Sequence, residues 1–151
     1  MSDELLNSLI EATIHEGASD LHLLVGRHPV IRVSGQLVPL IKQPKLTSKN
    51  ADGFLDGFLS PEDKQLFLKN KEIDFSYSFK DEVRFRGNAY YEKGNSGLAL
   101  RLIPRKIPSL KELNLPGTLE QFIKKQQGFF LVVGPMGHGK STTLASLIEM
   151  I

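Results

Sequence analysis

The chain of 151 residues contains no cysteine, so disulfide bonds and cysteine-ligated metal sites are both excluded. Its four histidines lack the spacing of a zinc site. No apolar run approaches the roughly 18 residues that a membrane-spanning helix needs. The chain opens with acidic rather than basic residues, so we also expect no secretory signal peptide. With 40% hydrophobic and 24% charged residues, these absences favour a soluble, cytoplasmic globular protein.

Positive residues are outnumbered in the first part of the chain, and acidic residues are few in the part that follows. Residues 1–82 carry nine Lys/Arg and thirteen Asp/Glu, a net charge of −4, whereas residues 83–125 carry nine and three, a net charge of +6. The positive block could face a nucleotide, or it could be a solvated or partner surface. Charge alone does not choose between these interpretations.

A glycine-rich segment near the C-terminal end carries the strongest chemical signal. Residues 129–133 form an apolar, β-rich run that predicts a buried parallel strand. The spacing that follows, Gly-x-x-x-x-Gly-Lys-Ser, is that of a P-loop, in which backbone N–H groups surround a polyphosphate. The alternative, a chance glycine-rich turn, does not explain the strand before it and the helix after it. The predicted nucleotide-binding residues are Gly134, Pro135, Met136, Gly137, His138, Gly139, Lys140, Ser141, Thr142 and Thr143.

The residue types in this loop predict separate tasks in binding ATP and Mg²⁺. Gly137 and Gly139 can adopt positive φ and leave room for a phosphate. Lys140 would contact the β- and γ-phosphates, and the Ser141 hydroxyl would bind Mg²⁺. His138 could be a catalytic residue, but a P-loop acts there through its backbone. We therefore favour a solvent-facing spacer.

The segment after the loop predicts a helix that begins at Thr142–Thr143 and has one apolar face, formed by Leu144, Leu147, Ile148 and Ile151. No residue that would end this helix follows it. A nucleotide-binding α/β domain needs several further parallel strands, and only ten residues follow Ser141. We therefore expect the sequence to be the N-terminal fragment of a longer protein.

The first hundred residues predict a mixed helix and strand domain. Apolar periodicity, turn residues and capping signals place helices at 3–16, 47–59 and 61–70, and strands at 20–25, 30–33, 36–38, 73–79, 83–91 and 98–102. His22 lies in the first of these strands. No second ligand has a matching spacing, so we favour a hydrogen-bonded structural histidine over a metal ligand.

Strand alternation predicts a face of the sheet that carries three arginines. Arg84 and Arg86 share one face of residues 83–91 with Asn88. If Tyr91 pairs with Leu98, or the register shifts by two, Arg101 lies on that same face. On these residues alone, a solvated surface and a functional surface are equally supported.

A basic segment bounded by Pro104 and Pro108 predicts a semi-rigid link. Capping-box patterns begin at Ser109 and Thr118, the second before a helix expected at 119–125. The expected organisation is an N-terminal domain at 1–104, linker and short helices at 105–127, and the start of an ATPase domain at 128–151.

Several segments together resemble the type II/type IV secretion ATPases, and within them most closely the pilus-retraction branch. These segments are residues 18–23 (Ala-Ser-Asp-Leu-His-Leu), 84–88, 100–104, 107–113 and 134–143. The resemblance implies an α+β fold class, with a PAS-like N-terminal domain followed by the first strand, P-loop and helix of an α/β RecA-like ATPase domain. It also implies a homo-hexamer at the inner-membrane base of a type IV pilus, a membrane platform protein as partner, and no nucleic acid.

The same resemblance assigns roles to matching residues. The Walker A role falls on 134–141, with Thr142 near the phosphates, and the arginines that approach nucleotide phosphates fall on Arg84, Arg86 and Arg101. Met136 and His138 stand where the family usually has Thr and Ser. Gly87 stands where an apolar β-branched residue is usual, which should weaken its strand slightly.

The family's catalytic glutamate, Walker B segment and histidine box are absent from these 151 residues. The recognisable motifs begin almost at Met1, which favours pilus retraction over assembly. The expected function is therefore an ATP-hydrolysing motor subunit for pilus retraction, with the fragment itself inactive. The alternatives are an assembly or secretion ATPase of the same family, or a non-enzymatic PAS-like adaptor that keeps the start of a P-loop.

Overall fold

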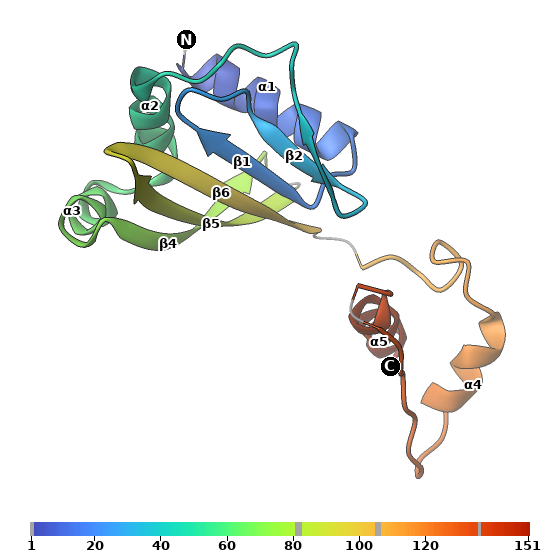
Figure 1. Cartoon of the computed structure of the whole chain (residues 1–151). Coiled ribbons are helices and arrows are strands. Elements are labelled where there is room, and N and C mark those ends of the chain that lie inside the picture. The colour runs from blue at the N-terminus through green and yellow to red at the C-terminus, as the bar shows by residue number, and fades with distance from the viewer. Residues whose placement is uncertain (1, 81–82, 105–106, 136) are drawn as a thin grey trace. The chain divides into compact units, whose positions relative to one another are not determined.

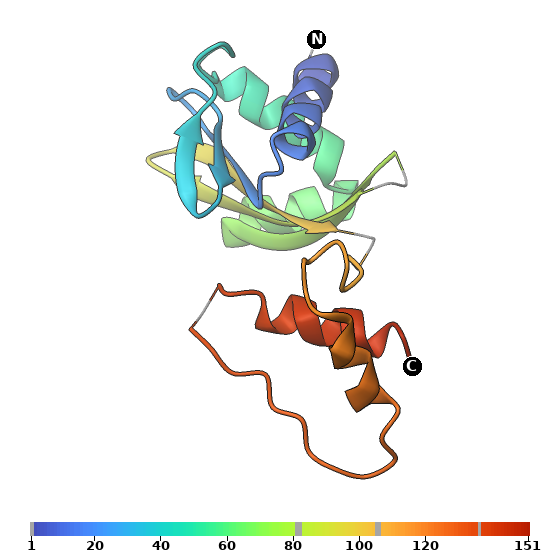
Figure 2. The same ribbon diagram turned by 90° about the vertical axis from the view of Figure 1, so that its right-hand side faces the viewer.

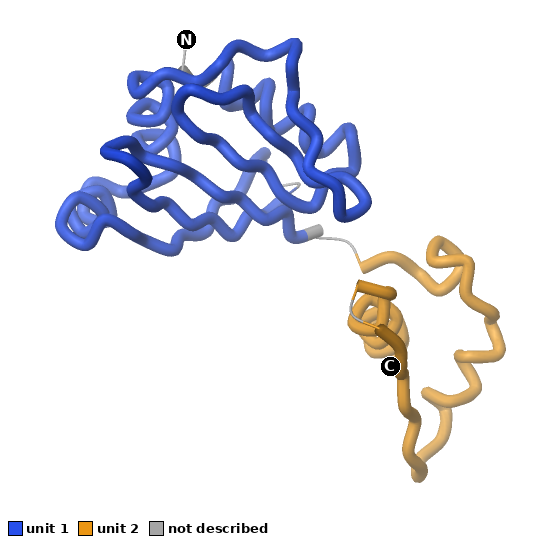
Figure 3. The backbone as a smooth tube through the Cα atoms, viewed as in Figure 1, with its two compact units in different colours: residues 1–103 blue, residues 104–151 orange. Residues whose placement is uncertain are grey.

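The structure is a computed structural model that describes residues 2–80, 83–104, 107–135 and 137–151. It divides into two compact units, residues 1–103 and residues 104–151 (Figure 3). The expected site residues fall in both units: the arginines in the first and the P-loop in the second. Each unit is described by itself.

The first unit is built on a six-stranded sheet with the order β3-β2-β1-β6-β5-β4 (Figure 1). The pairs β1–β2, β1–β6, β2–β3 and β4–β5 are antiparallel. Because β1 pairs with β6, the sheet joins a strand near residue 20 to one near residue 100. The strands are β1 (Asp20–Leu24), β2 (Val30–Val33), β3 (Gln36–Pro39), β4 (Glu72–Phe79), β5 (Val83–Glu92) and β6 (Asn95–Pro104).

Helices α1 (Ser2–His15) and α2 (Ser48–Phe58) pack on one face of this sheet (Figures 1 and 2). Helix α3 (Pro61–Asn70) contributes Phe67, which is fully buried in the same core. From the sheet, Leu21, Phe85 and Leu100 meet the helices. The core therefore lies on one side of the sheet, and the described residues of this unit provide no helix to cover the other side.

Local chemistry explains most element boundaries. The α2 helix begins after Thr47, whose side chain accepts a hydrogen bond from Asn50 N in a capping box. Ser60 caps α3, since its side chain accepts a hydrogen bond from Asp63 N at 3.1 Å, and Pro61 stands at the first helical position. Between β2 and β3, Ser34 and Gly35 both have positive φ, as a two-residue hairpin turn requires. The helices and strands expected for this unit are confirmed, with small differences at their ends.

The second unit contains the 3₁₀ turn Gly117–Leu119 and the helices α4 (Glu120–Ile123) and α5 (Lys140–Ile148). The capping box at Ser109 is present, since Ser109 N donates to Glu112 Oε2 and Glu112 N donates to Ser109 Oγ. It encloses a turn rather than a helix. The capping box expected at Thr118 is wrong, because neither the 3₁₀ turn nor α4 has a side-chain cap.

Two further expectations for this unit are wrong. Residues 129–133 form no strand, because no other described segment of this unit is a strand that could pair with them. Helix α5 begins at Lys140 rather than at Thr142, and it ends at Ile148. On its expected apolar face only Leu147 is buried, since Leu144, Ile148 and Ile151 are exposed. A strand needs hydrogen-bond partners and an apolar face needs a covering layer. The described residues of this unit supply no partner strand, and they cover only Leu147 of that face.

No helix in the described part of the chain combines the length and the apolar character that crossing a membrane requires.

Candidate functional site

The three arginines singled out by the sequence lie exposed on one face of the sheet, as predicted. In the β4–β5 pair, Arg84 lies opposite Ser78 and Arg86 opposite Ser76. Strand β5 ends at Glu92 and β6 begins at Asn95, and the two turn residues between them both have positive φ. A turn of this kind sets Glu92 opposite Asn95. Counting along both strands then sets Arg86 opposite Arg101, which is the register shifted by two from a Tyr91–Leu98 pair.

Asp20 connects this face to the centre of the sheet. It lies opposite Arg32 of β2 and opposite Arg101 of β6. Its Oδ1 accepts from Arg101 Nε at 3.0 Å, and its Oδ2 accepts from Arg32 Nε at 3.1 Å and from Ser19 Oγ at 2.8 Å. Burial alone would raise the pKa of Asp20, but the hydrogen bonds from Ser19 and Arg101 and the charges of both arginines lower it below its usual value. The carboxylate is therefore held in its charged form.

A second carboxylate holds Arg86. Asp74 accepts from Arg86 Nη2 at 3.2 Å and from Asn88 Nδ2 at 3.0 Å, and these hydrogen bonds, that of Asn88 first, lower the pKa of Asp74. This ion pair is exposed on both sides, with 69% of the Arg86 side chain and 60% of the Asp74 side chain accessible. An exposed pair of this kind contributes little to stability. Arg84 makes no ion pair with any described residue.

A shallow hollow of about 210 Å³ lies between these groups, lined among others by Asp20, His22, Asp74, Arg86 and Arg101. The pKa of His22 lies below its usual value, mainly because the side chain is buried. The charge of Asp20 raises this pKa, and the charges of Arg32 and Arg101 lower it. The Nε2 atom of His22 is buried and has no hydrogen-bond partner among the described residues. The expectation of a fully hydrogen-bonded histidine is therefore wrong.

Sequence reasoning found the arginines of this face but missed the two carboxylates that hold them. The signal for Asp74 was present, because the alternation in β4 places it on the polar face with Ser76. The role of Asp20 depends on β1 pairing with β6, which are about eighty positions apart in the chain. No local pattern contains that pairing.

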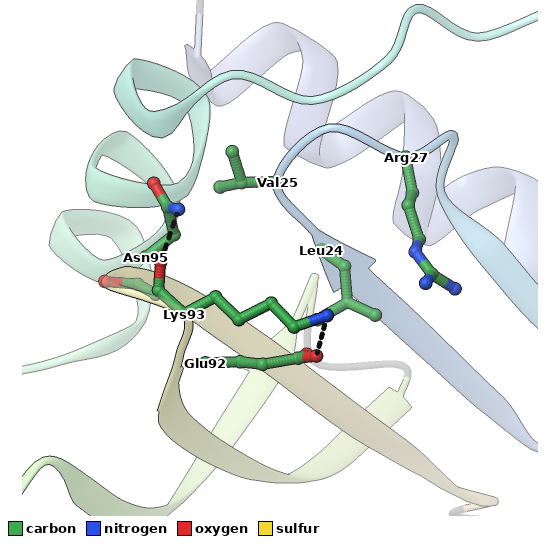
Figure 4. A pocket seen from close by; sticks show the side chains of 7 residues that line it. Leu24, Val25, Arg27, Glu92, Lys93 and Asn95 are labelled. Atoms are coloured by element: carbon green, nitrogen blue, oxygen red, sulfur yellow. Dashed lines mark hydrogen bonds and ion pairs between the residues drawn. The ribbon is translucent and has the colours of Figure 1, made fainter.

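A second hollow in the first unit, of about 140 Å³, lies where the β1–β2 and β5–β6 turns meet (Figure 4). Its cations are Arg27 and Lys93, and Lys93 Nζ lies 3.9 Å from Glu92 Oε1. Asn95 donates to the Lys93 carbonyl at 3.3 Å and so holds the turn. None of the residues expected to bind nucleotide lines this hollow.

In the second unit, the residues expected to form a P-loop lead directly into α5. Gly137 and Gly139 have φ of 80° and 76°, the left-handed conformation expected for them. Gly139 is the N-cap, and Thr143 N donates to Gly139 O at 2.8 Å as the helix begins. His138 is exposed, as expected of a spacer. Met136 lies outside the described residues. The first N–H groups of α5 therefore belong to Lys140, Ser141 and Thr142, at the helix end that attracts anions.

Lys140 reaches back across the loop, where its Nζ donates to the Pro135 carbonyl at 2.6 Å. The ammonium group thus lies on the segment that the motif assigns to phosphate, and among the described residues its acceptor is this one neutral carbonyl. A phosphate oxygen would replace that carbonyl with a charge-assisted bond, which is stronger. The loop is therefore equipped to exchange an internal contact for a bound anion.

The residues near the loop fit a magnesium ion only in part. Ser141 is exposed in the first turn of α5 and could give one hydroxyl ligand. The described residues include no group of three or more His, Asp or Glu side chains that could hold a metal. Any ion bound here would take its remaining ligands from phosphates and water, as Mg²⁺ commonly does.

Comparison with known proteins assigns the chain to a family. The family described as "Type II/IV secretion system protein" matches residues 2–151. The type IV pilus retraction ATPase PilT of Pseudomonas aeruginosa is 34% identical over 146 residues, which cover 97% of this chain and 42% of PilT. The type IV pilus ATPase PilU of the same organism is also 34% identical, over 93% of this chain and 36% of PilU.

Among solved structures, the crystal structure of the pilus retraction motor PilT with bound ADP superposes with a TM-score of 0.74 and 36% identity. That match covers 96% of this chain and 42% of the PilT chain. The chain thus spans about two-fifths of the length of these relatives. Because the family match covers residues 2–151, the chain belongs to the type II/IV secretion system protein family.

Proposed function

We propose that this chain is part of an ATP-hydrolysing motor subunit of a type IV pilus machine. The observation that carries the proposal is the loop at 134–143, which places two left-handed glycines and a lysine at the start of a helix. Relatives of this family are named as ATPases, and PilT was solved with ADP. In this proposal Lys140 contacts the β- and γ-phosphates of ATP, and Ser141 binds Mg²⁺.

We propose a separate role for the sheet face of the first unit. Arg84, Arg86 and Arg101 would neutralise charge on the phosphates during transfer, because phosphoryl transfer depends on positioning and electrostatic stabilisation. The first unit is the proposed PAS-like domain, and residues 128–151 begin the RecA-like domain. The domain bounds, the site residues and a hexameric ring of subunits are parts of this proposal.

We place the motor on the cytoplasmic side of the inner membrane, where a platform protein would receive the domain motion. Retraction is favoured over assembly because a relative at 34% identity is named a retraction ATPase. Deleting the gene distinguishes a retraction motor from an assembly motor. Loss of a retraction motor should leave surface pili but abolish their withdrawal, whereas loss of an assembly motor should remove the pili.

Lys140→Ala in the complete protein tests the enzymatic assignment. We expect steady-state ATP hydrolysis to be lost, because the substitution removes charge-assisted hydrogen bonds worth about 1.5–3 kcal/mol each. Lys125→Ala, an exposed lysine of the same unit outside the loop, serves as the control. Full turnover by Lys140→Ala would refute the assignment and favour a non-enzymatic adaptor.

A further inference from the structure

The arginines on this face of the sheet differ in the carboxylate that binds them, and Asp20 binds Arg101. This carboxylate lies between two strands and divides its oxygens, with Oδ1 accepting from Arg101 and Oδ2 from Arg32. Only 10% of the Asp20 side chain is exposed, whereas 73% of the Arg101 side chain is exposed. A nearly buried anion therefore anchors an arginine that otherwise faces solvent.

The two arginines on Asp20 have different remaining capacity. Arg32 also donates through Nη1 to the Gly35 carbonyl at 3.2 Å, so both sides of its guanidinium are in use, and only 35% of its side chain is exposed. Arg101 is held at 3.0 Å through Nε. Because a guanidinium is planar, fixing Nε also fixes the direction of the two Nη groups, which carry four further N–H donors.

The other arginines of this face lack such an anchor. Arg86 uses one of its Nη groups on Asp74, and both side chains of that pair are exposed. Its contact therefore occupies part of the fork that would bind a phosphate, and water competes with it. Arg84 has no ion-pair partner among the described residues. Arg101 is thus the cation of this face that is both held in place and free at its donor fork.

We propose that Asp20 is a positioning residue for Arg101, which it holds through Nε so that the two Nη groups face a nucleotide phosphate in a fixed orientation. An exposed arginine loses rotamer freedom when it binds a ligand, and one that is already held loses less. Arg32 and Ser19 complete the anchor, because they satisfy the second carboxylate oxygen and keep Asp20 from turning away. This inference rests on the proposed function.

The contact itself can be tested without any activity. In the ¹⁵N-labelled 151-residue chain, the Nε–Hε resonance of Arg101 should exchange slowly with water, and Asp20→Asn should make that exchange at least tenfold faster. Asn keeps the shape of Asp but removes the charge and one acceptor oxygen. Asp74→Asn, which removes the carboxylate on Arg86, is the matched control and should leave the Arg101 signal unchanged. Equal exchange in wild type and Asp20→Asn would overturn the proposal.

The functional consequence is tested by a double-mutant cycle in the complete protein. Asp20→Asn should lower kcat about tenfold, but less than twofold when Arg101 is already alanine, because the residue acts through Arg101. Independent, additive losses would show that Asp20 supports the fold only, and would overturn the proposal. Lys140→Ala separates this result from the proposed function: if that variant is inactive and the cycle is additive, only the positioning role fails.

If Asp20→Asn does not fold, Arg101→Lys tests whether the orientation of the Arg101 guanidinium matters for turnover. Lysine keeps the positive charge but has no fork that an Nε contact could orient. We expect its kcat to fall to within about threefold of that of Arg101→Ala. Retention of wild-type kcat by Arg101→Lys would overturn the proposal.

Discussion

Gly87 of β5 lies directly opposite Phe75 of β4, and the Phe75 ring fills the space that a side chain at Gly87 would need. A Cβ built at Gly87 would stand 2.2 Å from Phe75 Cζ. The same ring packs against Phe58 of α2, with 5.4 Å between the ring centroids. The absence of a side chain at Gly87 therefore leaves room for the aromatic ring of Phe75 from the neighbouring strand. The expectation that glycine weakens this strand slightly does not include this contact.

Gly87→Val should destabilise the protein by about 1–3 kcal/mol, because the new side chain must displace the Phe75 ring from its place beside Phe58. Thermal or urea unfolding of the 151-residue chain measures the change. Gly87→Ala combined with Phe75→Leu should recover part of the loss suffered by Gly87→Ala alone, since leucine leaves more room. Wild-type stability for Gly87→Val would show that the ring moves aside freely.

We expect substitutions of the three exposed arginines, Arg84, Arg86 and Arg101, to lower kcat by different amounts. Among Arg84→Ala, Arg86→Ala and Arg101→Ala in the complete protein, we expect at least one to lower kcat more than tenfold, and Arg101→Ala to have the largest effect. Arginines that stabilise phosphoryl transfer elsewhere contribute about 10³–10⁵-fold. Melting temperatures of Arg84→Ala and Arg86→Ala should stay close to that of the wild type, since both side chains are exposed. Arg101→Ala should still fold, because Asp20 keeps its hydrogen bonds from Arg32 and Ser19. Normal turnover in all three variants would make this face a solvated surface.

Because the pKa of His22 is lowered, we expect the protein to lose stability on mild acidification. Because burial lowers its pKa in the folded state, the unfolded state binds more protons as the pH falls below the usual value of 6.5. Stability therefore rises with pH through this window and is lost below it. Asp20 also has a lowered pKa and so acts in the same direction, but only near and below 3.8.

Chemical denaturation of wild type and His22→Gln between pH 5 and pH 8 tests this assignment. The variant should lose less stability over that range than the wild type does. His15→Gln is the control, because 85% of that side chain is exposed. Identical pH profiles for wild type and His22→Gln would assign the acid sensitivity to other groups.

The second unit predicts weak protection in the 151-residue chain. Phe129 is 87% exposed and Val133 is 80% exposed, and residues 129–133 have no strand partner among the described residues. Hydrogen exchange should therefore be fast at 128–151 and slow in β1, β5 and β6. We also expect this chain to bind ATP weakly and to release no phosphate at steady state. Strong protection of α5 together with sustained hydrolysis would contradict this prediction.

Local sequence determined the elements of the first unit because their boundaries depend on neighbouring residues. Ser60 and Pro61 set the start of α3, and Ser34 with Gly35 set the β2–β3 turn. The alternation in β5 placed Arg84 and Arg86 on the exposed face, and the turn after Glu92 kept Arg101 with them. The left-handed glycines before α5 could also be predicted, because the glycines and the helix start lie within ten residues.

Only the tertiary structure decided how the arginines are held and where the apolar runs are exposed. Asp20 meets Arg101 because β1 pairs with β6, and strand pairing across eighty residues leaves no periodic signal in either strand. Likewise, the run at Phe129–Val133 has the composition of a strand, but a strand exists only where another one satisfies its N–H and C=O groups. Composition therefore determined the kind of element each segment can form, and the available partners decided which of them did.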